Sequence, residues 1–238
     1  MSYTRAQLRD RVRQRADLEN TSAQVDAELN DHINEGAAYW HDFLIGVLGE
    51  RYSLTTVSGS TVAGTSSYNI GSAMTFNCTD FYRPINARVT FDSLSFPLAA
   101  FNPVDEILST ASTSWGADYL PRYAFEQNAD GTNKILFDPP PDQAYSITIK
   151  YHPAAPVYTA ESGAGGVIYM PFPEGIIYKA AIEMKTKERQ DASSLEKGLM
   201  AIQKRVEDWV GSVDMGEPWT TLRMKSGGHS RWRRDRIF

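Results

Sequence analysis

The sequence predicts an α+β protein: a helical bundle formed by the N- and C-terminal helices, an inserted antiparallel β domain, and an extended C-terminal arm. Apolar residues recur at helical spacing in both end regions, whereas the middle is rich in Thr, Ser, Tyr and Val and alternates like strands. We therefore expect bundle helices in residues 1–50 and 167–213, the β domain in 51–166 and the arm in 214–238.

A short helix is predicted at the start of the chain. Thr4 and Gln7 form a capping-box pattern, and Leu8, Val12 and Ala16 follow at four-residue spacing. The other faces of this helix carry Arg5, Arg9, Arg11, Arg13 and Arg15.

A longer amphipathic helix is predicted to begin at Thr21 and Gln24, a second capping-box pair, and to end near Gly49. Its apolar side chains fall within an arc of about 140°. They are Val25, Leu29, Ile33, Ala37, Trp40, Phe43, Leu44, Val47 and Leu48. Acidic residues lie on roughly the opposite side and predict a solvent-facing stripe, namely Asp31, Glu35 and Asp42.

Short strands and turns are predicted in the middle of the chain. They comprise a strand at 52–57, turns at 59–60 and 64–65, a hairpin of 86–91 with 94–98, a helical turn at 104–108, and a hairpin of 123–127 with 134–137. The clearest strand, 145–151, alternates strictly, so one face is expected in a core and the other in water. The prolines at 139–141 predict a rigid connection at the sheet edge.

Two helices are predicted after the glycine-rich segment 163–166, which is interpreted as a flexible linker. Pro173 and Glu174 suit the first turn of the first of them. Its apolar face is Ile176, Ile177, Ala180, Ala181 and Met184. Tyr178 and Ile182 point away from that face, which makes them either candidates for contact with a neighbouring subunit or ordinary exposed side chains.

The last helix is predicted to be capped by Ser193 and Glu196. Its apolar residues repeat at spacings of four and three, the pattern of a coiled-coil seam that packs lengthwise on another helix. They are Leu195, Leu199, Ile202, Val206, Trp209 and Val213.

The composition is ordinary for a soluble globular protein, with 42% hydrophobic and 22% charged residues among 238. No apolar run is long enough to cross a bilayer, and the N-terminus leads straight into charged residues, so neither a membrane partner nor a secretory signal is expected. The single cysteine, Cys78, fits synthesis in a reducing cytoplasm.

No catalytic constellation is evident, so we expect a non-enzymatic protein with no catalytic, metal or cofactor-binding residues. His32 and His41 are nine residues apart on one helix and point in opposite directions, while His152 and His229 are isolated. Asp138 and Asp142 bracket the prolines and are interpreted as turn caps. Four aromatic residues could form a sugar-binding platform, but packing in a core is the favoured interpretation. They are Trp115, Tyr119, Tyr123 and Phe125.

The end of the chain differs in charge from the rest. Residues 223–238 hold six of the 24 Lys and Arg but only one of the 29 Asp and Glu, which leaves 18 basic and 28 acidic residues elsewhere, a net charge of −10. Apolar anchors stand among the basic residues, and a Gly227-Gly228 hinge precedes most of them. The segment is either a solvated terminus, an arm that docks in a groove, or a phosphate-binding tail.

Several segments, taken in order, resemble tailed-bacteriophage head-to-tail adaptor (connector) proteins. The resemblance starts with TRAQLRDRVRQRADLEN at 4–20 and DAELNDHINE at 26–35. It continues with VAGTSSYNI at 62–70, DFYRPI at 80–85, KILFDPPPDQAY at 134–145 and PEGIIYKAA at 173–181. It spans nearly the whole chain, and its motifs are structural rather than chemical.

This resemblance implies a structural virion protein at the head-tail interface, made in the host cytoplasm. It implies a homo-oligomeric ring of about twelve copies between the portal protein and the tail or nozzle proteins, through which double-stranded DNA passes without specific binding. The residues corresponding to the family's portal-docking arm are Arg223, Lys225, Arg231, Trp232, Arg233, Arg234, Arg236, Ile237 and Phe238. The alternatives are a nucleic-acid-binding protein that uses the basic tail and the arginine-lined first helix, and a carbohydrate-binding tail component built on the β domain.

Overall fold

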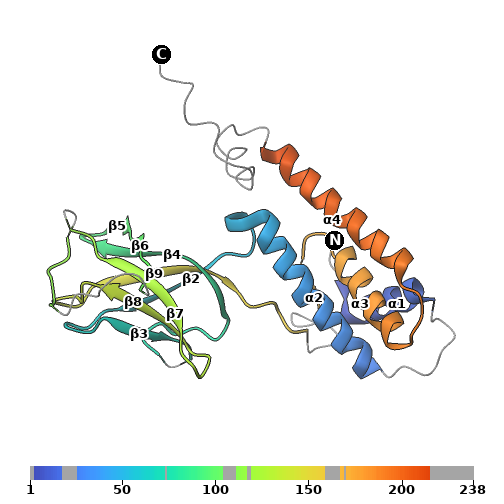
Figure 1. The fold of residues 1–238 in the computed structure, drawn as a ribbon, viewed down its shortest axis with the longest axis horizontal. Helices are drawn as coiled ribbons and strands as arrows, with labels where there is room; N and C mark the ends of the chain where they lie inside the picture. The colour runs from blue at the N-terminus through green and yellow to red at the C-terminus, as the bar shows by residue number, and fades with distance from the viewer. Residues whose placement is uncertain are drawn as a thin grey trace, which may run out of the picture. The chain divides into compact units, whose positions relative to one another are not determined.

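The computed structural model describes residues 3–17, 26–72, 74–103, 111–116, 119–158, 167–168 and 170–214. The chain divides into two compact units: the β unit, Glu50–Ala154, and the helical unit, formed by the segments before and after it. The α+β class is confirmed, because helices dominate one unit and sheets the other (Figure 1).

The boundary at the end of the β unit differs from the expected residue 166. Val167–Ile168 (β10) pairs antiparallel with Tyr3–Thr4 (β1), and the Tyr158 N–H donates to the side-chain oxygen of Asn34 at 2.9 Å. The described residues beyond Ala154 are therefore part of the helical unit.

The helical unit contains α1 (Arg5–Ala16), α2 (Asp26–Leu48), α3 (Glu174–Lys187) and α4 (Ser193–Asp214), and α3 contacts each of the others. A short 3-10 helix, η1 (Gly49–Arg51), follows α2. The predicted capping box of α1 is confirmed: Thr4 Oγ1 accepts from the Gln7 N–H at 3.2 Å, and Gln7 Oε1 accepts from the Thr4 N–H at 2.9 Å.

Most residues of the predicted apolar faces of α1, α2 and α3 are buried, but Phe43 and Val47 of α2 are only half-buried. The fully buried residues are Leu8, Val12, Ala16, Leu29, Ile33, Ala37, Trp40, Leu44, Ile176, Ala180, Ala181 and Met184. His41 and Ile45 are buried instead, so the buried face of α2 is displaced round the helix from the predicted one. The predicted start of α2, at Thr21, lies outside the described residues.

The start of α4 differs from the prediction. Asp191 caps this helix, because its carboxylate accepts a hydrogen bond from the Ser193 N–H at 3.0 Å, and the Ser193 hydroxyl donates to the same carboxylate. Ser193 was predicted to be the cap but is the first helical residue.

The buried stripe of α4 also departs from the predicted seam. Leu195, Leu199 and Val206 are buried as predicted, and Ile202 is half-buried. Trp209 is 47% exposed, and Val210 is buried in its place. An α-helix has about 3.6 residues per turn, so a straight helix drifts off a strict 4-3 repeat. The side chain of Val213 lies outside the described residues.

The β unit has two four-stranded sheets with the orders β2-β9-β4-β5 and β3-β8-β7-β6. The strands are β2 (Thr55–Ser60), β3 (Ser67–Ile70), β4 (Phe81–Phe91), β5 (Leu94–Pro97), β6 (Ala99–Ala100), β7 (Arg122–Gln127), β8 (Asn133–Asp138) and β9 (Ser146–Pro153). Buried residues of both sheets form one hydrophobic cluster, which makes the unit a β sandwich.

Both predicted hairpins and the alternating strand are confirmed. β4 and β5 pair antiparallel around Asp92 and Ser93, whose φ angles of 45° and 70° suit a two-residue hairpin turn. β7 and β8 also pair antiparallel, and residues 128–132 connect them. In β9, Ile147, Ile149 and Tyr151 are buried while the residues between them are more exposed.

Several details of the β unit correct the prediction. β2 runs through Gly59 and Ser60, which were predicted to form a turn; a Cβ on Gly59 would lie 2.6 Å from the Thr75 carbonyl oxygen, so the strand needs glycine for this close approach. β6 pairs in parallel with β7, so that sheet is mixed. The prolines at 139–141 follow β8, an inner strand, and are buried rather than at an edge. The predicted helical turn at 104–108 lies outside the described residues.

Candidate interaction site

Two arginines of α1 fasten this helix to α2. Arg13 Nη2 lies 2.5 Å from Asp26 Oδ1, and Arg9 Nη1 lies 3.8 Å from Asp26 Oδ2 and donates to Asn30 at 3.3 Å. The hydrogen bond from Arg13, together with the charge of Arg9, lowers the pKa of Asp26 from its ordinary value. These side chains are therefore already engaged within one chain.

Arg11 and Arg15 lie on the exposed side of α1 and stack on aromatic rings. The Arg11 guanidinium carbon is 4.4 Å from the centre of the Tyr3 ring, and that of Arg15 is 4.9 Å from the centre of the Tyr178 ring. Within the part of the chain that the structure describes, neither arginine forms an ion pair with a carboxylate.

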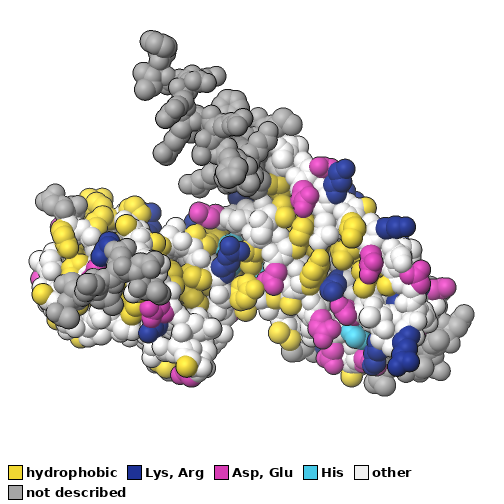
Figure 2. All heavy atoms as spheres, in the orientation of Figure 1, with side chains coloured by type: hydrophobic (Ala, Val, Ile, Leu, Met, Phe, Trp, Pro, Cys, Tyr) yellow, Lys and Arg dark blue, Asp and Glu magenta, His cyan; other side chains and the backbone are white. Residues whose placement is uncertain are grey.

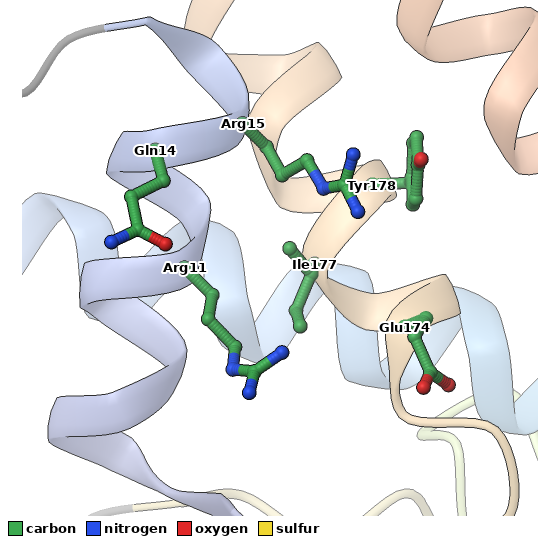
Figure 3. Close-up of a pocket in the computed structure, with 6 residues that line it drawn as sticks. All are labelled: Arg11, Gln14, Arg15, Glu174, Ile177 and Tyr178. Atoms are coloured by element: carbon green, nitrogen blue, oxygen red, sulfur yellow. The ribbon is translucent and has the colours of Figure 1, made fainter.

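These two arginines line a pocket of about 250 Å³ between α1 and α3, here called the arginine pocket. Its lining is Arg11, Gln14, Arg15, Glu174, Ile177 and Tyr178 (Figure 3). Both guanidinium groups extend from α1 toward α3, and the Glu174 side chain lies at the α3 end of the same pocket. Guanidinium groups in this position can bind carboxylate or phosphate oxygens.

Tyr178 and Ile182, the residues predicted to meet a neighbouring subunit, have contacts inside the helical unit. Ile182 is buried, which corrects the expectation that it points away from the apolar face. The Tyr178 ring packs on Gly198 of α4, where a Cβ would lie 2.2 Å from its Cε1 atom, and it stacks under Arg15. A subunit contact at these two positions stays a prediction.

The aromatic group considered as a sugar platform mostly belongs to the core of the β unit. Trp115 and Tyr123 are buried, and Phe125 packs against the same cluster, whereas Tyr119 is 50% exposed. The favoured interpretation, core packing, is therefore confirmed for Trp115 and Tyr123. Those two rings cannot form the face of an exposed platform.

A second pocket, of about 450 Å³, lies in the β unit beside the β4–β5 hairpin and includes Leu94, Trp115 and Tyr145 in its lining. The Trp115 and Tyr145 rings stack with their centres 4.9 Å apart. The Tyr145 hydroxyl accepts a hydrogen bond from the backbone N–H of Trp115 at 3.0 Å and donates one to Asp142 at 2.7 Å. This hydrogen bond lowers the pKa of Asp142. Asp138, predicted as a turn cap, is buried and pairs with Arg122 at 2.5 Å.

The cysteine and the three histidines among the described residues are dispersed. His41 and His152 are buried in different units, and the half-buried His32 of α2 lies 3.4 Å from Glu35. Burial raises the pKa of the Cys78 thiol. Over the described residues, no group of three or more His, Cys, Asp or Glu side chains is placed to hold a metal ion, and no helix is long and apolar enough to span a membrane.

The predicted portal-docking arm lies outside the described residues. Its members are Arg223, Lys225, Arg231, Trp232, Arg233, Arg234, Arg236, Ile237 and Phe238. Their role stays a prediction. The arginine pocket, in contrast, is not predicted from the sequence, because its lining comes from α1 and α3, which are distant in the chain.

The fold defines an α+β protein in which a β sandwich is inserted between helices from the two ends of the chain. The model of the SU10 adaptor protein family matches residues 3–216, which is most of the chain. The chain therefore belongs to the SU10 adaptor protein family, in agreement with its resemblance to phage head-to-tail adaptors, and this membership points to a structural rather than an enzymatic role. No curated protein matches the chain.

Proposed function

We propose that this chain is a structural virion protein that joins the portal of a tailed phage to its tail. The observation that carries the proposal is the family match over residues 3–216, which covers both units. The sequence segments that resemble those of head-to-tail adaptors, taken in their order along the chain, support the same role. In this function the two units act through the surfaces that they present, and no bond in a substrate is broken.

The proposed working form is a ring of about twelve copies through which the genome passes. The charge of the chain supports a passive channel. Outside residues 223–238 the chain carries 18 basic and 28 acidic residues. A lumen with an excess of carboxylates does not hold phosphates, so DNA can slide through it.

The C-terminal arm is proposed to dock on the portal protein. An exposed ion pair contributes only about 0–1 kcal/mol, whereas a buried tryptophan anchor can contribute more than about 2 kcal/mol. Trp232 and Phe238 are therefore expected to supply most of the binding free energy, and the arginines between them to orient the arm.

The test is binding of the purified chain to purified portal, with a variant that lacks residues 223–238. The truncated variant should keep its circular dichroism spectrum and lose docking, and Trp232→Ala with Phe238→Ala should weaken docking more than Arg233→Lys with Arg234→Lys. Unchanged docking of the truncated variant would refute the role of the arm. A full-length chain that never binds portal would refute the adaptor function itself.

The alternatives receive less support from the structure. The first helix was considered as a basic surface for nucleic acid, yet Arg9 and Arg13 already contact Asp26. The carbohydrate alternative depended on aromatic residues of which Trp115 and Tyr123 are buried.

A further inference from the structure

We propose that the arginine pocket binds α2 of a second copy of this chain, with Asp31 and Glu35 as the carboxylates that enter it. The inference rests on the proposed function in one respect, namely that the chain works as an assembly of copies. It adds which two surfaces of neighbouring copies meet, and by which side chains.

The arginines are held in a state that suits a carboxylate. Arg11 lies over the Tyr3 ring and Arg15 over the Tyr178 ring, so each guanidinium is held against an aromatic side chain. A guanidinium has five N–H donors, and a carboxylate can bind two of them with parallel hydrogen bonds while the aromatic contact is kept. Because aromatic contacts already orient these side chains, less conformational entropy is lost on binding.

The same helix shows this type of recognition within one chain. Arg13 and Arg9 of α1 both contact Asp26, the first residue of α2. Arg11 and Arg15 carry the same chemical group but face the other side of α1, where the described residues offer them no ion pair. Carboxylates from outside the chain would give Arg11 and Arg15 the ion pairs that Arg9 and Arg13 already have.

The acidic stripe of α2 supplies matching groups. Asp31, Glu35 and Asp42 are exposed, and they fall within an arc of about 40° opposite the buried face of the helix. The Glu35 side chain is 64% exposed although His32 is 3.4 Å away. Asp31 and Glu35 are one turn apart, about 6 Å, which is the same spacing as Arg11 and Arg15. Two ion pairs can therefore form in register.

The two surfaces point in different directions, so one copy cannot satisfy itself. α2 packs its buried side on α3, where a Cβ on Gly36 would lie 3.0 Å from the Ile176 carbonyl oxygen. The arginine pocket uses Ile177 and Tyr178 on another side of α3. A contact between two different surfaces of identical chains continues from copy to copy and closes a ring when the rotation allows it.

Charge favours a second copy over DNA as the occupant. Glu174 lines the pocket as well, so the site offers two cations beside one carboxylate rather than a row of cations. Figure 2 shows acidic side chains in several places on the visible surface of the helical unit, between basic and hydrophobic ones. Duplex DNA needs many phosphate contacts at once, whereas a pair of carboxylates needs only these two arginines.

The test is sedimentation velocity of the full chain over a series of protein concentrations. R11E/R15E and D31R/E35R should each weaken self-association by about tenfold or more, because like charges then face each other. The variant with all four changes should recover association, since the pairs are restored with reversed polarity. K197E/K204E reverses two exposed lysines of α4 and serves as the matched control, which should associate like the wild type.

Association of R11E/R15E at the wild-type strength would overturn the proposal, as would a four-change variant that stays impaired or a wild-type chain that remains monomeric throughout. If R11E/R15E alone unfolds the chain, R11Q/R15Q gives the same comparison. Loss of duplex DNA binding without loss of self-association would identify nucleic acid as the occupant instead. If the four-change variant recovers self-association but the wild-type chain does not bind portal, the interface between copies is supported and the adaptor function is refuted.

Discussion

Gly175 of α3 lies against the indole ring of Trp40 of α2: a Cβ at position 175 would be only 2.3 Å from Cδ2 of the tryptophan. The indole N–H donates to the Pro171 carbonyl oxygen at 3.0 Å, so the ring cannot simply move aside. Trp40 is fully buried. This contact fixes how closely the helix from the second half of the chain approaches the helix from the first half.

Gly175→Ala should destabilise the helical unit by about 1–3 kcal/mol, because the added methyl group overpacks a filled core. Chemical denaturation followed by circular dichroism measures the effect. Gly46→Ala in α2 is the matched control, since a Cβ there meets nothing within 4 Å. The control should be stabilising by up to about 1 kcal/mol, and equal effects of the two substitutions would contradict the close packing.

Gly198→Ala should likewise destabilise the contact between α3 and α4, because the Tyr178 ring occupies the space that a Cβ at 198 needs. A loss of about 1–3 kcal/mol is expected in the same denaturation experiment. Gly211→Ala, further along α4 with no neighbour within 4 Å, should not destabilise the protein. Were Gly198→Ala as harmless as Gly211→Ala, Tyr178 would not pack inside the unit.

Tyr145→Phe should destabilise the β unit by about 1–3 kcal/mol, because it leaves the buried backbone N–H of Trp115 without its hydroxyl acceptor. The pKa of Asp142 should rise toward its ordinary value, since the Tyr145 hydroxyl is the main group that lowers it. Carboxyl NMR titration measures this change. Tyr119→Phe, which alters an exposed tyrosine of the same unit, is the control; an unshifted Asp142 in Tyr145→Phe would contradict the assignment.

Asp26 makes the stability of the helical unit depend on acid. Its pKa is lowered in the folded state by Arg13 and Arg9, so its contribution is complete above the ordinary pKa of 3.8 and disappears as the pH falls through the folded value. Asp26→Asn should therefore reduce the loss of stability on acidification, as measured by denaturation at a series of pH values below neutral. The control is Asp208→Asn, on the exposed side of α4, which should lose as much stability on acidification as the wild type does.

Local rules explain why much of the helical unit could be predicted from the sequence. Thr4 and Gln7 cap α1 through contacts three residues apart, and such contacts are fixed by the chain itself. The hairpin turn at Asp92 and Ser93 is equally local. The seam of α4 failed at Trp209 because a 3.5-residue repeat and a 3.6-residue helix diverge after a few turns.

Contacts between distant segments explain what could not be predicted. Gly59 reads as a turn residue by itself, and only the approach of the Thr75 carbonyl shows why a strand needs glycine there. The arginine pocket depends on α1 and α3 meeting across most of the chain length. Arg11 and Arg13 lie on different sides of α1, but their partners, the Tyr3 ring and Asp26, could not be predicted from the spacing.

The most direct test of the adaptor function is electron microscopy of the purified chain mixed with purified portal, beside the variant that lacks residues 223–238. We expect the intact chain to form a closed ring seated on the portal, and the truncated chain to leave the portal bare. An intact chain that stays dispersed and never decorates the portal would contradict the account.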